Sequence, residues 1–350
     1  MKTIKDLDIK DKTILVRVDY NVPIKDGKVE SDLRISASLP TINYLLEHGA
    51  KKIVLISHLG RPDGKEMPEF SLSPIVKTLE QLLPGSKIGF YPLPTSSDKL
   101  NIPDDTKIAL LENLRFDPGE EANDPNFIKK IIDATGADAF VQDGFAVVHR
   151  AHASTDAVKK FLPVYAGLLL EKEITNLTAA IKNPKKPLLL IIGGAKVDDK
   201  QPLIDKFTKI ADHIFVGGKI AADGYKSTDK TIVVADDFDE NEEGKKLDIG
   251  PLSTAKLANL ITDAKIIIWN GLLGYAEDPA YATASTITAE LIGEHQDATT
   301  IICGGDTAGF VENLMESHPN LHYSLVSTGG GAALEFLLGN DLPGIKSITE

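Results

Sequence analysis

The sequence predicts an α/β protein with two domains, each a parallel sheet flanked by helices, joined by one inter-domain helix. Short runs rich in β-branched residues and leucine alternate with longer amphipathic stretches, as expected of parallel sheets with crossover helices. The chain has 350 residues, more than one typical hydrophobic core accommodates. One helical stretch, residues 167–182, stands between two sets of strand candidates and ends at Asn183-Pro184.

The clearest strand candidate is Leu188–Ile192, an apolar run too short for a free-standing buried helix. Gly193 and Gly194 end this run and allow a sharp turn. The other strand candidates are Thr13–Val18, Lys52–Ile56, Lys107–Leu111, Ala139–Val141, His213–Val216, Thr231–Val234, Lys265–Trp269, Thr299–Cys303 and Tyr323–Val326. Helical spacing marks Ser36–His48, Ser73–Leu83, Phe127–Thr135, Asp198–Ile210, Thr254–Thr262 and Thr283–Gly293. The charge-rich stretch Asp236–Lys246 predicts a solvated loop.

Composition excludes several classes of partner. The net charge of −13 argues against general affinity for nucleic acid or for an acidic membrane surface. Cys303 is the single cysteine, so an intramolecular disulfide is impossible and a thiolate metal site is implausible. We expect no signal peptide and no membrane span, since no apolar segment of membrane-spanning length is found. We therefore expect a cytoplasmic protein that acts on small molecules, and nothing in the sequence demands more than a monomer.

Arginine and histidine residues follow the strand candidates of the first half. In a parallel sheet these carboxyl ends share one edge, where several guanidinium groups bind a small multi-anionic ligand bidentately. Asp19 and Asn21 lie there to orient hydroxyl groups or to pair with the arginines. Any one arginine alone would suggest a surface salt bridge, but the repetition favours an anion site. The residues are Arg17, Asp19, Asn21, Arg34, His58, Arg61, Arg115, His149, Arg150 and His152.

The second half carries glycines at the corresponding places. Backbone N–H groups from several glycine turns cradle a polyphosphate, and Asp306 is available to hold Mg²⁺. Tight turns alone would explain a lone glycine pair, but Lys196 and Lys200 accompany the repeated turns. The turns are Gly193–Lys196, Gly217–Lys219, Trp269–Gly274, Gly304–Thr307 and Ser327–Gly331. An anion domain and a nucleotide domain together are what a small-molecule kinase requires, since closure brings both substrates in line and excludes water. A carboxylate acceptor would need no general base, which fits the lack of an obvious one.

Motifs along the chain resemble those of the phosphoglycerate kinase family. In order they read RVDYNVP, SHLGRP, LLENLRFDPGEE, HRAHAST, LLLEKEI, GGAKVDDK, LDIGP, WNG, GGDT and STGGGAALEFL. The resemblance implies two Rossmann-like domains, with residues 1–166 binding 3-phosphoglycerate, 167–183 forming the inter-domain helix and 184–334 binding nucleotide. It also implies that the tail, about 335–350, folds back on the first domain. The implied activity is reversible, Mg²⁺-dependent phosphoryl transfer between 1,3-bisphosphoglycerate with ADP and 3-phosphoglycerate with ATP, in glycolysis.

The resemblance also assigns roles by position. Arg34 and Lys196 would stabilise the transferring phosphoryl group from the acceptor and nucleotide sides, and Asp306 would hold Mg²⁺. The 3-phosphoglycerate residues would be Asp19, Asn21, Arg34, His58, Arg61, Arg115 and Arg150, with Arg17, His149 and His152 completing a basic patch. The nucleotide residues would be Gly194, Lys196, Lys200, Gly218, Asn270, Glu277, Gly304, Gly305, Asp306 and Thr307, with Glu277 on the ribose.

The chain departs from the family between Ala221 and Leu247, where the segment is shorter than is typical. The missing part would include helical cover over the base of the nucleotide. We therefore predict weakened or less base-selective nucleotide binding. Two alternatives to an active phosphoglycerate kinase follow from this departure. One is a non-catalytic protein that binds triose phosphate and has a degraded nucleotide site, and the other is a related kinase with a different donor nucleotide or phospho-acid acceptor.

Overall fold

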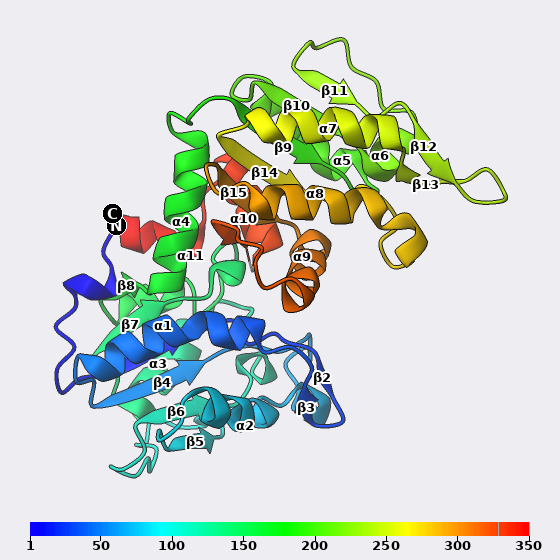
Figure 1. The fold of residues 1–350 in the computed structure, drawn as a ribbon. Helices are drawn as coiled ribbons and strands as arrows, with labels where there is room; N and C mark the ends of the chain where they lie inside the picture. The colour runs from blue at the N-terminus through cyan, green and yellow to red at the C-terminus, as the bar shows by residue number, and fades with distance from the viewer. Residues whose placement is uncertain (328, 350) are drawn as a thin grey trace. The chain divides into compact units, whose positions relative to one another are not determined.

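The computed structural model describes residues 1–327 and 329–349. The chain forms two compact units, residues 1–172 with 341–350, and residues 173–340. Helix α4 (Leu168–Ile181) begins in the first unit and ends in the second. Both units are built around parallel sheets with helices packed on them, so the predicted fold class is confirmed (Figure 1).

The sheet of the first unit has the strand order β5-β6-β4-β1-β7-β8, and every pair in it is parallel. Arg17, the last residue of β1, lies opposite Ile56 of β4 and Gln142 of β7. The loops that follow these strands therefore start at the same level, on one edge of the sheet. The strands are β1 (Thr13–Arg17), β4 (Lys52–Ile56), β5 (Ile88–Tyr91), β6 (Ile108–Leu111), β7 (Ala139–Gln142) and β8 (Val164–Ala166).

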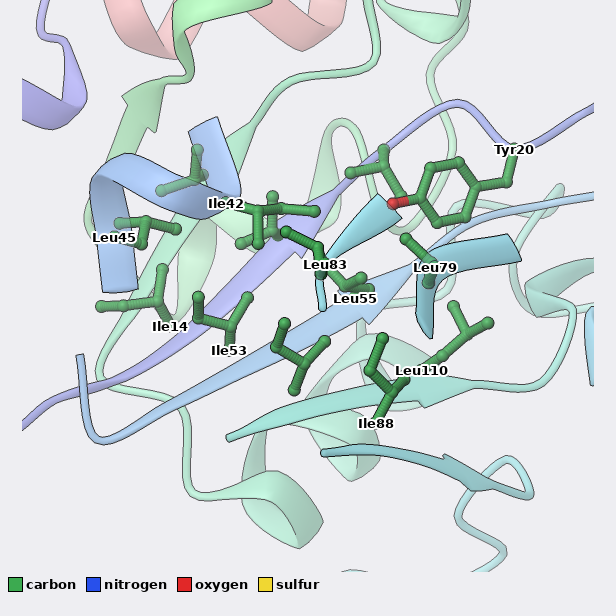
Figure 2. Packing of buried hydrophobic residues seen from close by; sticks show 14 of the residues in the cluster. Ile14, Tyr20, Ile42, Leu45, Ile53, Leu55, Leu79, Leu83, Ile88 and Leu110 are labelled. Carbon is green, nitrogen blue, oxygen red and sulfur yellow. The ribbon is translucent and has the colours of Figure 1, made fainter. Parts of the chain in front are cut away.

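Helices α1 (Leu33–Glu47) and α2 (Ser73–Leu82) cover one face of this sheet (Figure 2). Ile42 of α1 and Leu79 of α2 are fully buried with Ile53 of β4. Each such aliphatic side chain contributes roughly 1.5–3 kcal/mol by leaving water. Further elements of this unit are α3 (Pro125–Thr135), the hairpin β2 (Ile24–Lys25) with β3 (Lys28–Val29), and the short helices η1 (Ile4–Asp6), η2 (Pro68–Phe70), η3 (Leu114–Phe116), η4 (Phe145–Val147) and η5 (Ala157–Lys160).

The C-terminal helix α11 (Pro343–Thr349) belongs to the first unit. Its backbone is bonded at both ends, Gly344 N to Val148 O at 2.9 Å and Lys2 N to Ile348 O at 3.0 Å. A Cβ at position 344 would lie 2.8 Å from the Cα of Val148, so only glycine allows this approach.

The sheet of the second unit is also parallel, in the order β11-β10-β9-β14-β15-β16. The chain leaves β9 toward β10 and β11 and later returns to β14 on the other side of β9. This change of direction is a topological switch point, where sheets of this kind bind ligands at the carboxyl ends of the strands. Ile192, Asn270 and Cys303 lie level there. The strands are β9 (Leu188–Ile192), β10 (His213–Val216), β11 (Ile232–Val234), β14 (Ile266–Asn270), β15 (Thr299–Cys303) and β16 (Leu325–Val326).

Trp269 of β14 is fully buried in this unit, and its indole Nε1 donates to Gly271 O at 2.8 Å. Leu257 of α7 and Ile292 of α8 belong to the same core. The helices are α5 (Val197–Phe207), α6 (Gly218–Ala222), α7 (Pro251–Asp263), α8 (Thr283–Glu294), α9 (Gly305–Ser317) and α10 (Gly330–Leu338), with the short helix η6 (Pro279–Tyr281).

The prediction of a solvated loop over Asp236–Lys246 is wrong in part. The antiparallel hairpin β12 (Phe238–Glu240) with β13 (Lys246–Ile249) occupies much of this stretch. The Lys246 ammonium lies over the Phe238 ring, 4.5 Å from its centroid. The carboxylate of Asp237 accepts from the backbone N–H groups of Leu252 and Ser253 in the first turn of α7. Charged residues thus form structure here through pairing and capping, which hydrophobic patterning does not register.

Candidate functional site

All five arginines of the chain lie in the first unit, and most of them follow strand ends at one edge of its sheet. Their charges act on one another. Burial lowers the pKa of Arg17, and the charges of Arg115 and Arg150 lower it further. The pKa of Arg115 is lowered by burial and then by Arg150 and Arg61. Cations held this close together repel one another, so an anion bound among them is strongly favoured.

Arg17 is the buried centre of this cluster, with 1% of its surface exposed. Its Nε donates to Ser154 Oγ at 3.0 Å, its Nη1 to Ser57 Oγ at 3.3 Å, and its Nη2 lies 3.1 Å from His58 Nδ1. Ser154 Oγ in turn donates to the buried carboxylate of Glu120 at 2.6 Å. Arg17 was predicted as part of a basic patch. Its hydrogen bonds go to protein groups, so it supports the site from the interior of the unit.

His58 and His152 are neutral histidines beside the arginines. Burial, followed by the charge of Arg17, lowers the pKa of His58 well below its usual value. Burial and the charge of Arg115 lower the pKa of His152 to about 4. A guanidinium only donates, so His58 Nδ1 must accept from Arg17 and the ring proton sits on Nε2. His58 is thus a neutral hydrogen-bond donor.

The loop after β1 is tied to α1 and to the loop after β4. Arg34 Nη1 donates to Asp19 Oδ2 at 2.6 Å. The Asp19 side chain is 3% exposed and that of Arg34 is 31% exposed, so a buried carboxylate holds a partly accessible guanidinium. Asn21 Oδ1 accepts from Gly60 N at 2.9 Å.

The other three arginines differ in how open they are. Arg115 Nη1 donates to Gly60 O at 2.7 Å and its Nε pairs with Glu121 at 3.0 Å. Its buried Nη2 has no hydrogen-bond partner among residues 1–327 and 329–349. Arg61 is exposed and Arg150 is partly exposed. Arg61 and Arg150 can therefore form bidentate bonds to an anion without being extracted from the core, and Arg115 offers its Nη2.

Sequence reasoning assigned no role to Glu120 or Ser154, although both lie in motifs that resemble the family. Burial raises the pKa of Glu120, while the charge of Arg17 and the hydrogen bond from Ser154 lower it. Ser154 N also donates to Glu120, at 3.0 Å. A carboxylate beneath the arginines offsets their repulsion. No local pattern signals this role, because Glu120 and Arg17 are remote in sequence.

In the second unit, glycines bring the ends of β9, β10 and β14 into backbone contact. A Cβ at Gly193 would lie 2.2 Å from Leu272 O, and one at Gly271 would lie 2.3 Å from Gly193 O. Gly218 has φ +60° and lies beside Gly194 in the same way. Side chains are excluded from this surface, so a ligand could approach the backbone closely.

Lys200 of α5 lies at the same edge, where its ammonium donates to Asn270 Oδ1. Burial lowers the pKa of Lys200, while the charges of Asp199 and Asp306 raise it. Thr307 Oγ1 accepts from Gly271 N at 2.8 Å and ties α9 to the end of β14. Among the nucleotide residues predicted from sequence, Lys200, Asn270, Asp306 and Thr307 are therefore brought together.

Helix α9 begins at Gly305 after Gly304, whose φ is +96°. A helix start with this glycine turn and an exposed Asp306 in the first turn suits a phosphate that carries a metal. Lys196 is the exposed N-cap residue of α5. Glu277 is exposed on the loop after β14, where its hydrogen bond raises the pKa of Tyr275. Within the described part of the chain, no hydrogen bond or ion pair joins Lys196 or Glu277 to Lys200, Asn270, Asp306 or Thr307.

Comparison with known proteins places the chain in a family. The sequence profile of the family described as Phosphoglycerate kinase matches residues 4–233 and 221–340. Phosphoglycerate kinases of Thermosipho africanus and Fervidobacterium nodosum are 39% and 38% identical to the chain, over 99% of it and 97% and 98% of their own lengths. The solved phosphoglycerate kinase of Coxiella burnetii has a TM-score of 0.80 at 31% identity, covering 99% of this chain and 98% of its own. That of Pyrococcus horikoshii has a TM-score of 0.85 at 26% identity, covering 100% and 98%.

The fold and the two sites define an α/β phosphotransferase. More particularly, the chain belongs to the phosphoglycerate kinase family. Membership confirms the predicted enzyme class, with a carboxyl group as acceptor and a nucleotide as co-substrate, and favours the main prediction over both alternatives.

The comparisons also bear on the shortened segment. The alignment with the Thermosipho protein spans 399 positions and this chain has 350 residues, so at least 49 positions have no counterpart here. The two profile matches overlap at residues 221–233, inside the segment 221–247.

No helix in the described part of the chain is long and apolar enough to cross a membrane.

Proposed function

We propose that the arginine cluster of the first unit binds 3-phosphoglycerate and that the glycine-rich edge of the second unit binds ATP or ADP for reversible phosphoryl transfer. The observation that carries this proposal is the gathering of every arginine of the chain in one unit, above a buried glutamate and beside neutral histidines. A small ligand with two anionic ends, a phosphate and a carboxylate, matches such a cluster.

In the acceptor site, Arg61, Arg115 and Arg150 bind the anionic groups of 3-phosphoglycerate. His58 donates its Nε2 proton to a ligand oxygen. Asp19 and Asn21 orient the ligand hydroxyl, and Asp19 also holds Arg34 in place. Arg34 then stabilises the charge of the transferring phosphoryl group. The acceptor carboxylate is ionised at neutral pH, so the reaction proceeds without a general base.

In the donor site, Lys200 binds a nucleotide phosphate, and the backbone at Gly194, Gly218, Gly304, Gly305 and Thr307 surrounds the phosphate chain. Lys196 stabilises the transferring group from the nucleotide side. Asn270 contributes to the nucleotide site by holding Lys200 through its Oδ1, and Glu277 contacts the ribose. Transfer depends mainly on position and on charge neutralisation, which these groups supply.

Asp306 fits a magnesium ion that arrives with the nucleotide. Mg²⁺ keeps several waters and takes one or two protein carboxylates in addition to phosphate oxygens. The exposed Asp306, beside a glycine turn and a helix start, meets this requirement. Among residues 1–327 and 329–349, no group of three or more His, Cys, Asp or Glu forms a site that holds a metal by itself. When bound, the ion neutralises phosphate charge.

The proposal extends to the cellular setting: a monomer in the cytoplasm that acts on small molecules and binds neither nucleic acid nor membrane. The net charge of −13 supports the last two points.

The test is 3-phosphoglycerate-dependent consumption of ATP with Mg²⁺, with the acyl phosphate product trapped. Lys196→Ala serves as the active-site control. Turnover that requires 3-phosphoglycerate and disappears in the control supports the assignment. Binding of 3-phosphoglycerate without turnover, with every nucleoside triphosphate tried, would favour the non-catalytic alternative.

A further inference from the structure

Cys303, to which neither the sequence nor the proposed mechanism gives a role, bonds directly to a residue of the donor site. It is the last residue of β15 and lies opposite Asn270, the last residue of β14. Asn270 Nδ2 donates to Cys303 Sγ at 3.3 Å, and the thiol lies 3.5 Å from Trp269 O, to which it donates. The thiol is fully buried.

Asn270 connects this thiol to Lys200. The amide has a donor end and an acceptor end, and here they face different partners. Nδ2 faces the sulfur, while Oδ1 accepts from the Lys200 ammonium. Asn270 is 1% exposed, so water does not readily replace the sulfur as partner of Nδ2. A buried amide N–H without an acceptor is costly, and Asn270 would turn to find another.

Lys200 depends on its hydrogen bond to Asn270 because its other neighbours are carboxylates, which attract the ammonium away from Asn270. Carboxylates of Asp199 and Asp306 act on its charge, and Asp306 is the residue proposed to hold Mg²⁺. An ammonium paired with Asp306 would neutralise that carboxylate and leave the phosphate position. Oδ1 of Asn270 offers Lys200 a neutral partner at the edge of the sheet.

We propose that Cys303 is a positioning residue for phosphoryl transfer: through Asn270, its sulfur keeps Lys200 at the carboxyl edge of the sheet, ready for the nucleotide phosphate. The proposal rests on the proposed function of Lys200. It does not require thiolate chemistry, and burial raises the pKa of Cys303 to about 11, so the thiol stays neutral at physiological pH.

The competing explanation is that Cys303 only fills space between β14 and β15. Two substitutions separate the explanations. Cys303→Val keeps roughly the volume of the side chain but removes the acceptor, whereas Cys303→Ser keeps an acceptor in a smaller side chain. If position depends on the hydrogen bond, Cys303→Ser resembles the unchanged protein and Cys303→Val does not. If Cys303 only packs, the order is reversed.

The experiment measures kcat and KM for ATP and for 3-phosphoglycerate in the unchanged enzyme, in both variants and in Cys303→Ala. We expect Cys303→Val and Cys303→Ala to raise KM for ATP about tenfold, the worth of one hydrogen bond near 1.4 kcal/mol. KM for 3-phosphoglycerate should not change. Thermal unfolding of each variant shows whether it folds.

A double-mutant cycle with Lys200→Ala completes the test. If Cys303 acts through Lys200, Cys303→Val adds no further increase in KM for ATP once Lys200 is alanine. Equal effects in both backgrounds, or loss in Cys303→Ser with retention in Cys303→Val, would overturn the proposal. A Lys200→Ala enzyme with unchanged KM for ATP would instead refute the assigned role of Lys200, and absence of turnover in the unchanged protein would refute the proposed function itself.

Discussion

Arg34 Nη1 lies 2.6 Å from Asp19 Oδ2, with the carboxylate buried and the guanidinium partly exposed. Such a pair is asymmetric. Asp19 is fixed by its surroundings, so the contact fixes the direction of Arg34 rather than the reverse. One Nη group of Arg34 is engaged and the side chain keeps an accessible surface, which is the arrangement expected of a group that must contact a charge formed during the reaction.

Arg34→Ala and Lys196→Ala should each lower kcat by ~10²–10³-fold or more, because each removes a donor to the transferring phosphoryl group. The measurement is steady-state turnover with both substrates saturating. Lys256→Ala is the matched control, since Lys256 is an exposed lysine that pairs with Asp236 in the second unit. A variant with unchanged kcat would remove that residue from the mechanism.

His58 should remain neutral throughout the pH range in which an ordinary histidine titrates. Its pKa is lowered by burial and by Arg17, so the unfolded state binds a proton near pH 6.5 that the folded state refuses. Titration of His58 therefore leaves the free energy of unfolding unchanged above the unfolded pKa and decreases it as pH falls below that value. The measurement is an NMR titration of the His58 ring from pH 8 to pH 5. A shift to the imidazolium signal near pH 6.5 would contradict the prediction.

Asp143 should make the free energy of unfolding depend on pH in the direction opposite to that of His58. Burial raises the pKa of Asp143 to about 7, although Leu169 N and Leu170 N at the start of α4 donate to its Oδ1. Between the unfolded pKa near 3.9 and about 7 the folded state keeps a proton that the unfolded state has released, so stability falls as pH rises through this window.

Asp143→Asn should remove this dependence, because the amide keeps an acceptor for α4 and does not ionise. Denaturant unfolding at several pH values from 4.5 to 8 measures it. The difference in unfolding free energy between variant and unchanged protein should grow with pH, by at most about 4 kcal/mol, from 1.36 kcal/mol per pKa unit. Parallel curves for the two proteins would show that Asp143 does not titrate in this range.

Nucleotide selectivity should be weak. The relatives have at least 49 aligned positions without a counterpart here, and the profile match breaks at 221–233. Phosphate contacts are the same for every base, so losing cover over the base should reduce discrimination more than catalysis. We expect kcat/KM for ATP and GTP to lie within about tenfold, a difference of 1.4 kcal/mol. Strong preference for ATP would show that the shorter segment still recognises adenine.

The sequence reveals strands that are buried on both faces. Three strands are found with the predicted bounds: Leu188–Ile192, Lys52–Ile56 and Thr299–Cys303. A continuous run of β-branched residues or leucine is what a strand buried on both faces of a parallel sheet requires. Strand β5 was not predicted. It is short, partly exposed and interrupted by Gly89, so its pattern is weak.

The arginine site was predicted from one rule, that loops after parallel strands share an edge. The rule gives no information about how deeply each side chain is buried. It does not distinguish Arg17, which is buried, from Arg61, which is exposed, because both follow strands. Nor does it pair Arg17 with Glu120, which comes from another loop. Thr328, part of a predicted glycine turn, lies outside the described residues.

The burial of Trp269 has a spectroscopic consequence. It is the single tryptophan of the chain, it lies in the second unit, and it precedes Asn270 directly. Fluorescence excited at the indole band therefore reports on this unit alone, since the first unit has no tryptophan to add background. Unfolding of the two units can be separated in a single sample by comparing emission with circular dichroism. Because Cys303 shares a hydrogen bond with the Trp269 carbonyl, emission also offers an optical signal close to the proposed nucleotide site.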